Sequence, residues 1–239
     1  AGNARGGIHG RTITLNTLDD AYDVKKAEAN AKQLLADSNT FALFNCFGTP
    51  HTEAILPLVK ESGTPFFAPL TGAQSARVAA RNVFNIRASY AEEVDKMVQH
   101  LHTVGIKKIS IAYQANAFGK EIDNAAHRAM AKLKLPEGVS ATVANDGQDA
   151  KAAAQKIAQA EPEAVILGLA GKPTLEFVKA FRALRRGTAL YALSVMGTPA
   201  TLTALGADAA GINITQVVPM PSSPTVPISR EFLQAWKAS

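Results

Sequence analysis

The sequence predicts an α/β protein built on doubly wound parallel sheets. Short runs of β-branched or aromatic residues alternate with stretches in which apolar residues recur every three or four positions. Several of the short runs are almost entirely apolar, which is typical of strands covered by helices on both faces. Alternation of strands and helices along all 239 residues favours parallel pairing through helical crossovers. The predicted strands are 12–15, 41–44, 65–68, 83–86, 108–112, 139–143, 164–168, 189–193 and 212–218.

Helix signals occupy the stretches between these strands. Apolar residues within 94–101 fall on one face of a helix, and Ser89 and Glu92 have the spacing of a capping box at its start. Thr49 before Pro50 is typical of an N-cap followed by proline in the first turn. These signals predict helices that begin directly after strands.

Two segments have no room for a strand–helix unit and predict crossings between two lobes. Residues 87–89 form a polar break after a strand, and residues 219–227 are too rich in proline for either element. We therefore expect a first lobe over 1–88, a second lobe over 89–218, and a crossover with a return helix over 219–239.

Composition excludes several classes of function. The net charge is +5, but lysine and arginine occur singly or in pairs, so we expect no nucleic-acid partner. A single cysteine, Cys46, excludes an internal disulfide and any CxxC metal or redox site. No apolar run approaches the roughly 20 residues that span a bilayer. The first residues have no leader pattern, so any secretion signal is expected to lie outside this chain.

Motifs for catalysis and nucleotide binding fail on inspection. The segment ending in Gly171–Lys172 resembles a phosphate-binding loop, but Ile166 replaces its first glycine and Pro173 its Mg²⁺-binding hydroxyl residue. The acidic pair Asp19–Asp20 lacks the third carboxylate of a Mg²⁺ site, and we expect it to cap the following turn and helix. The sequence therefore predicts no catalytic residue, no metal site, no cofactor and no enzyme.

Two turns that follow neighbouring predicted strands, 47–52 and 70–73, combine glycine with threonine hydroxyls at the start of a helix. Glycine lets a ligand approach the backbone, and the unpaired N–H groups of a helix start suit a carboxylate. Simple helix capping explains either turn alone, whereas both turns on adjacent strands favour binding. The candidate ligand-binding residues in these turns are Phe47, Gly48, Thr49, Leu70, Thr71 and Gly72.

An ordered series of motifs resembles the type I periplasmic binding proteins, and more closely their branched-chain amino-acid (Leu/Ile/Val-binding) subgroup, which feeds ABC transporters. The series is NARGGIHGRTITLNTLDDAYD, FNCFGTPHTEA, GTPFFAPLTGA, VFNIRASYAEE and IAYQANAFGKE, followed later by YALSVMGTPA and GINITQVVPMP. It runs over essentially the whole chain. Each motif alone is loose, and their order is what makes the resemblance specific.

The resemblance implies two Rossmann-like lobes with parallel sheets, joined by crossing strands and closing over a ligand by hinge motion. It also implies that this chain lacks the first strand and helix of the family and much of its C-terminal part. The expected location is the periplasm, or the extracytoplasmic side of the membrane.

For the binding site, the resemblance implies that the two turns hold the carboxylate of the ligand and that Phe118 forms an aromatic wall. It places Gly171 where branched-chain binders have another contacting aromatic residue, and Met196 near their acidic acceptor for ammonium. Both positions depart from the family, because neither supplies those groups. Either the acceptor lies outside this chain, or the ligand is not an ordinary α-amino acid. Leu169 is expected to close over the apolar body together with Phe118 and Met196.

The sequence thus predicts a solute-binding protein of an ABC importer that captures an amino acid or related organic acid. The expected partners are the ligand and a membrane permease, and the expected state is a monomer or weak dimer. Two alternatives stay open: the same module as the sensor domain of a receptor, and, more distantly, an α/β enzyme. Sequence beyond Ser239 would distinguish sensor from carrier.

Overall fold

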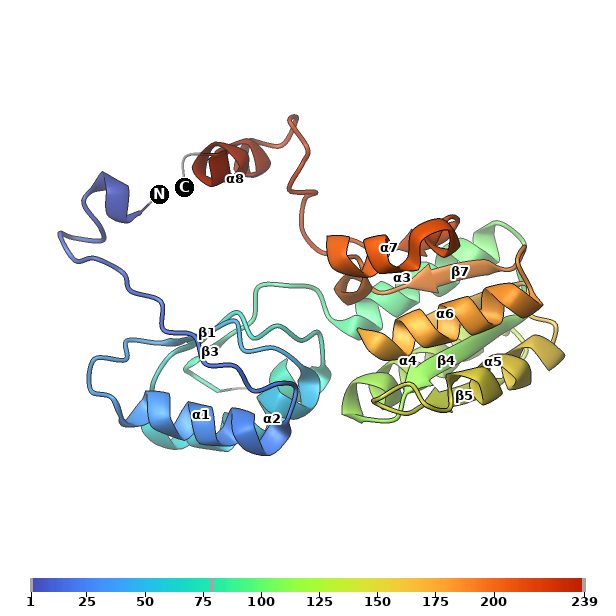
Figure 1. Cartoon of the computed structure of the whole chain (residues 1–239), viewed down its shortest axis with the longest axis horizontal. Helices are drawn as coiled ribbons and strands as arrows, with labels where there is room; N and C mark the ends of the chain where they lie inside the picture. Colours follow the sequence, from blue (N-terminus) through green and yellow to red (C-terminus); the bar gives the residue numbers. More distant parts are fainter. Residues whose placement is uncertain (1, 78–79, 238–239) are drawn as a thin grey trace.

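The computed structural model describes residues 2–77 and 80–237, which form two parallel sheets with helices packed against them (Figure 1). The first sheet has the order β1 (Leu43–Phe44), β2 (Phe66–Phe67) and β3 (Val83–Phe84). The second sheet follows the topology of a doubly wound fold, in which the crossover helices lie on both faces. Its strands, in spatial order, are β5 (Ser140–Val143), β4 (Ile109–Gln114), β6 (Ala164–Gly168), β7 (Ala189–Ala192) and β8 (Ile212–Ile214). The predicted α/β class with parallel sheets is confirmed.

The first sheet is covered on one face by α1 (Val24–Ala36) and α2 (Thr49–Ser62). The strand register puts Leu43 beside Phe66, and both are buried under these helices. The next residue of each strand is a phenylalanine on the opposite face, and these three side chains are 43–55% exposed. Described residues therefore cover only one face of this sheet.

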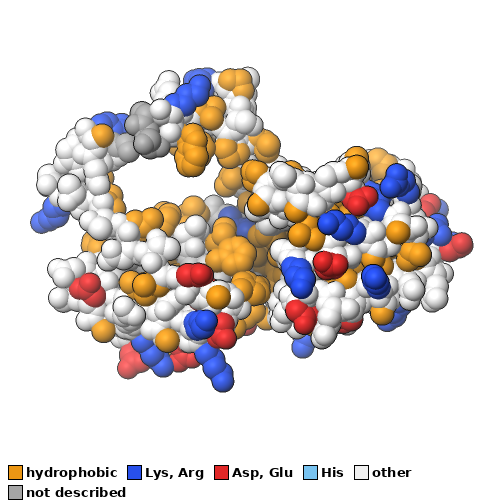
Figure 2. Space-filling model, viewed as in Figure 1, with side chains coloured by type: hydrophobic (Ala, Val, Ile, Leu, Met, Phe, Trp, Pro, Cys, Tyr) orange, Lys and Arg blue, Asp and Glu red, His pale blue; other side chains and the backbone are white. Residues whose placement is uncertain are grey.

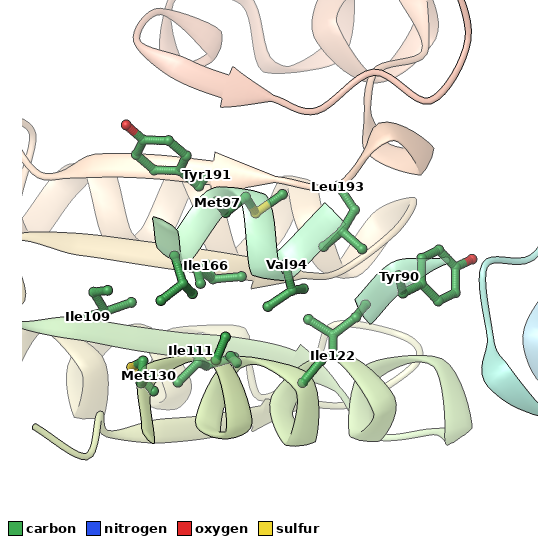
Figure 3. Close-up of a cluster of buried hydrophobic side chains, with 14 of the residues drawn as sticks. Tyr90, Val94, Met97, Ile109, Ile111, Ile122, Met130, Ile166, Tyr191 and Leu193 are labelled. Carbon is green, nitrogen blue, oxygen red and sulfur yellow. The ribbon is translucent and has the colours of Figure 1, made fainter. Parts of the chain in front are cut away.

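The second sheet is covered on both faces. One cluster of buried side chains lies between the sheet and α3 (Tyr90–Thr103) with α4 (Ala117–Lys132), as Figure 3 shows. A second cluster lies under α5 (Ala150–Gln159), α6 (Lys172–Leu184) and α7 (Pro199–Leu205). All five residues of β6 are buried, as expected for a central strand of a sheet covered on both sides.

Of the two predicted helix caps, the one at the start of α3 is present and the one at the start of α2 is not. The Ser89 side chain accepts from the Glu92 N–H while Glu92 accepts from the Ser89 N–H, so the predicted capping box is confirmed. Thr49 is not the N-cap of α2. That position belongs to Gly48, whose φ of 99° is in the left-handed region that favours glycine, and Thr49 is the first helical residue.

Residues 12–15 are not a strand, contrary to the prediction. They are extended, but the backbone of Ile13 bonds to the side chain of Asn3, through both its N–H (2.8 Å) and its carbonyl (2.7 Å). Ile13 and Leu15 are 60% and 70% exposed. A strand needs a ladder of backbone bonds to a neighbour, and no described segment pairs with this one in a sheet.

The chain passes between the two bodies through residues 85–89 and again after β8, where residues 215–226 lead to α8 (Pro227–Lys237) (Figure 1). On α8, Ile228 and Phe232 are 60% and 49% exposed. Among the described residues, no helix is both long enough and apolar enough to cross a membrane. The lobe boundaries at residues 88 and 218 remain a prediction.

Candidate functional site

A hollow opens where the first turns of α2 and α4 face each other across the loop that follows β2. It contains about 260 Å³ of space free of atoms, part of it open to solvent. Figure 2 shows apolar side chains gathered between the two bodies of the molecule. The residues lining the hollow are Tyr22, Phe47, Gly48, Thr49, Leu70, Tyr90, Phe118, Ala170 and Val195.

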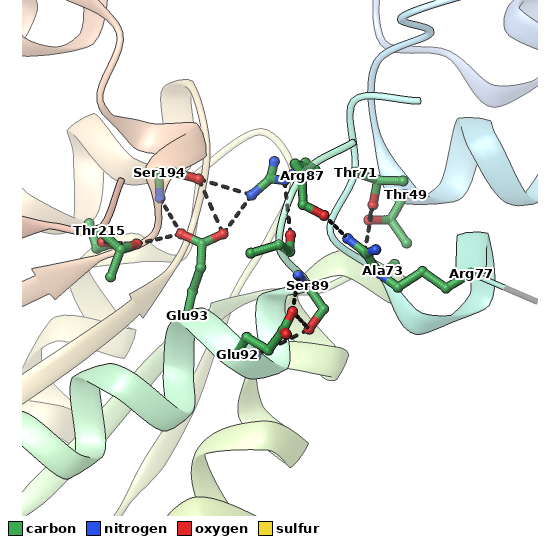
Figure 4. A network of polar contacts seen from close by, with 12 residues as sticks. Thr49, Thr71, Ala73, Arg77, Arg87, Ser89, Glu92, Glu93, Ser194 and Thr215 are labelled. Atoms are coloured by element: carbon green, nitrogen blue, oxygen red, sulfur yellow. Dashed lines mark hydrogen bonds and ion pairs between the residues drawn. The ribbon is translucent and has the colours of Figure 1, made fainter. Parts of the chain in front are cut away.

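The two turns singled out in the sequence meet at one edge of this hollow. The hydroxyls of Thr49 and Thr71 lie 2.7 Å apart, and both residues are buried (Figure 4). Backbone bonds join the same loops, from the Gly48 N–H to the Leu70 carbonyl (3.3 Å) and from the Leu70 N–H to the Cys46 carbonyl (2.9 Å). The hydroxyl of Thr71 also accepts from the Ala73 N–H. Two segments over 20 residues apart are therefore held as one rigid rim.

The start of α2 presents polar groups that have no partner among the described residues. Gly48 provides no side-chain cap, and neither the Thr49 nor the His51 N–H donates to a described group. His51 is 1% exposed, yet both its ring nitrogens lack a partner, as does the buried hydroxyl of Thr52. Because a helix N-terminus carries partial positive charge, this arrangement suits an anion.

Aromatic rings from both bodies border the hollow. Tyr22 packs against Phe47 with ring centroids 5.8 Å apart, and against His51 at 4.5 Å. On the other side, Tyr90 and Phe118 make an edge-on contact at 5.1 Å. Burial raises the pKa of Tyr22, so its hydroxyl stays protonated at neutral pH. The predicted aromatic at Phe118 lies in the lining, and the sequence analysis did not identify Tyr22 or Tyr90.

The loop before α1 positions Tyr22 through the acidic pair. Asp19 accepts from the Ala21 N–H (2.8 Å) and Asp20 from the Tyr22 N–H (2.7 Å). Ala21 and Tyr22 both have positive φ, a conformation that such side-chain bonds stabilise. The pair caps the turn as expected, but it does not cap the helix that follows, because the N-cap of α1 is Asp23.

The remaining predicted residues lie outside the lining. Leu169 and Met196 are buried in the cluster under α5 and α6, and the hollow is lined instead by their neighbours Ala170 and Val195. Gly171, with φ 62°, is the exposed residue before α6.

Gly72 and Cys46 lie close to the rim without lining the hollow. A Cβ on Gly72 would come within 2.7 Å of the Tyr90 backbone nitrogen, so this loop lies directly against α3. Burial raises the pKa of the Cys46 thiol to about 11, which keeps it protonated and unreactive at neutral pH.

A buried ionic cluster that the sequence analysis missed lies beside the hollow; we call it the crossing network (Arg87, Glu93, Ser194 and Thr215). Arg87 pairs with Glu93 at 2.5 Å and also donates to the Ser194 hydroxyl at 2.9 Å (Figure 4). Glu93 further accepts from the Ser194 N–H (2.8 Å) and from the Thr215 hydroxyl. The network joins both crossing segments to the first turn of α3.

The lining contains no charged side chain. In the described part of the chain, no group of three or more His, Cys, Asp or Glu side chains is arranged to hold a metal ion. What the hollow offers is an apolar body with one polar edge, which can bind a ligand but brings no nucleophile or acid–base pair to it.

Comparisons with known proteins bear on the family and the fold. A family model described as "Periplasmic binding protein" matches residues 2–239. A substrate-binding periplasmic protein of Ralstonia solanacearum superposes with a TM-score of 0.91 at 31% identity, over 99% of this chain and 67% of that one. A possible leucine/isoleucine/valine-binding protein of Rhodopirellula baltica superposes with a TM-score of 0.89 at 28% identity, over 99% and 65% of the respective chains.

The curated relatives are longer than this chain. The "Leu/Ile/Val-binding protein homolog 3" of Brucella melitensis biotype 1 is 26% identical over 171 residues, which make up 70% of this chain and 45% of that protein. The chain therefore spans less than half of the length of that relative.

Proposed function

The chain belongs to the periplasmic binding protein family, and on that premise we propose that it captures a small carboxylate-bearing ligand, an amino acid or related organic acid, for an ABC importer. The family is a solute-binding fold that works outside the cytoplasm and does not catalyse reactions. We place this protein on the extracytoplasmic side of the membrane, as a monomer or weak dimer that delivers its ligand to a membrane permease.

The observation that supports the proposal most strongly is the unsatisfied polar edge at the start of α2. Buried polar groups in folded proteins nearly always have hydrogen-bond partners. At this edge the Thr49 N–H has none among the described residues, and neither do the N–H and the ring of His51, which is buried next to the lining. A ligand carboxylate would accept from these donors and interact favourably with the helix dipole.

The proposed mechanism divides the work between two lobes. Residues 1–88 hold the carboxylate on the rim formed by Gly48, Thr49, Thr71 and their neighbours. Residues 89–218 close over the apolar body with Phe118, Ala170 and Val195 of the lining. Residues 219–239 return toward the first lobe, and bending of the crossing segments opens and closes the hollow.

Calorimetric titration of the Thr71→Ala variant with a carboxylate that the parent protein binds tests the rim. The Thr71 hydroxyl bonds to the Thr49 hydroxyl and accepts from the Ala73 N–H. Its loss therefore weakens a hydrogen bond from the rim to the charged carboxylate of the ligand. We expect affinity to fall by roughly 1.5–3 kcal/mol. Thr103→Ala is the matched control, because its exposed hydroxyl bonds only within α3. Equal affinities of the two variants for the carboxylate would show that the rim is not part of the binding site.

A further inference from the structure

We propose that the hollow selects carboxylates that carry no ammonium group, and disfavours α-amino acids. This inference rests on the proposed function and narrows the ligand class of the same site. It narrows the ligand class suggested by the names of the Leu/Ile/Val-binding relatives, and it is argued from this chain's own residues.

The first support is the chemistry of the lining. An α-amino acid bound by its carboxylate holds its ammonium within a few ångströms of the rim, where that cation needs a carboxylate or several oxygen acceptors. All nine lining residues are uncharged, and most are aromatic or aliphatic. An ammonium group there would lose its water without gaining an ionic partner.

The second support is that carboxylates around the hollow already accept hydrogen bonds. Both oxygens of Glu93 bond to the other members of the crossing network. One oxygen of Glu121 accepts from the Gln74 N–H at 2.8 Å, and burial raises its pKa. One oxygen of Asp20 accepts from the Tyr22 N–H. An ammonium group would have to share these carboxylates with the bonds that order the loops.

Side-chain amide oxygens on the second-lobe side of the hollow also accept hydrogen bonds already. The side-chain oxygen of Gln114 accepts from the N–H of Ala170, a lining residue, at 3.2 Å. The oxygen of Asn145 accepts from both Gln114 (2.9 Å) and Asn116 (2.8 Å). Asn116 itself accepts from the Gly119 N–H to cap α4. These amides hold the loops that carry the lining, so an ammonium group would have to share their oxygens with the donors already bound.

The test compares acids that differ only in the ammonium group. The purified protein is titrated calorimetrically with 4-methylpentanoate against L-leucine, and with 3-phenylpropanoate against L-phenylalanine. We expect each deaminated acid to bind about tenfold to hundredfold more tightly than its amino acid. Equal or tighter binding of the amino acids overturns the inference and leaves the proposed function standing. Failure of all four acids to bind overturns both.

A gain-of-function variant tests the cause of this selectivity. Val195→Glu places a carboxylate in the lining, and we expect it to shift the preference toward the amino acid of each pair by about tenfold or more. Val104→Glu is the matched control, because Val104 is 55% exposed and lies outside the hollow. If Val195→Glu is folded by circular dichroism and its ratio of affinities for the two acids of each pair is unchanged, the absence of a charged group in the lining does not explain the selectivity.

Discussion

Tyr90 contacts two polar regions that use their hydrogen-bonding groups in opposite ways. Arg87 of the crossing network lies over the Tyr90 ring at 5.0 Å, and in that network each charged group meets a partner. Tyr90 also lines the hollow, and beside the hollow the buried ring of His51 at the start of α2 has no described partner. A satisfied network stabilises one arrangement of the chain, whereas unsatisfied donors favour the arrival of a ligand.

The contrast between the crossing network and the hollow predicts the largest loss of stability for a substitution in the crossing network. Glu93→Ala leaves the Arg87 guanidinium buried without its ionic partner, and we expect the free energy of unfolding to fall by about 3–5 kcal/mol in urea denaturation. Glu61→Ala, at an exposed position near the end of α2, should change it by less than about 0.5 kcal/mol. Similar losses in both variants would show that the network contributes nothing special to stability.

Packing of the rim against α3 gives the next largest effect. The methyl group of Gly72→Ala would lie 2.7 Å from both the Cδ1 and the backbone nitrogen of Tyr90, so the loop must move. We expect a loss of about 1–3 kcal/mol in thermal or urea denaturation. Gly187→Ala is the control, since a Cβ there meets nothing within 4 Å. A Gly72→Ala protein as stable as this control would mean that the rim is looser than the contacts indicate.

His51 should show the opposite behaviour. Because both nitrogens of its buried ring lack a partner, His51→Leu removes groups that cost stability in the ligand-free protein. We expect the free energy of unfolding to stay within about 1 kcal/mol of the parent or to rise, while carboxylate affinity falls. The comparison variant is His127→Leu, which loses a contact with the Ser140 hydroxyl and should be destabilised. A marked loss of stability in His51→Leu would contradict the contrast between the two regions.

Glu121 gives the smallest effect, and it depends on pH. Burial raises the pKa of Glu121 above its ordinary value of 4.5. The folded state therefore holds this proton more tightly than the unfolded chain, so its contribution to stability falls as pH rises through the raised pKa. Glu121→Gln keeps an oxygen that can accept from the Gln74 N–H and removes the charge. We expect the variant to be slightly more stable near about pH 7, with the difference vanishing below 4.5.

Much of the fold could be predicted because its signals are local. The capping box at Ser89 depends on residues three apart, and the central strand β6 of the second sheet is apolar throughout. Residues 12–15 show the limit of that logic. Their alternation is suitable for a strand, but a strand exists only where another segment pairs with it, and Asn3 occupies the backbone of Ile13 instead.

Less of the candidate site was predictable. The two turns at Thr49 and Thr71 were found because each follows a strand. Tyr22 was missed because its position depends on a left-handed turn stabilised by Asp20. Leu169 and Met196 were chosen one residue away from Ala170 and Val195, since side chains of neighbouring residues face opposite ways and the sequence alone does not fix which way.

The sequence separations within the crossing network have a consequence for synthesis of the chain. Glu93 bonds to Ser194 across 101 residues and to Thr215 across 122. A growing polypeptide that has emerged only as far as α6 therefore contains the carboxylate and Arg87 without the groups that complete their coordination. Because long loops close late, the hydrogen bonds of Glu93 are completed only when nearly the whole described chain has left the ribosome. During a translational pause before residue 215, the nascent protein would lack the bond between Glu93 and Thr215. Chaperones and proteases can recognise such an incompletely folded form.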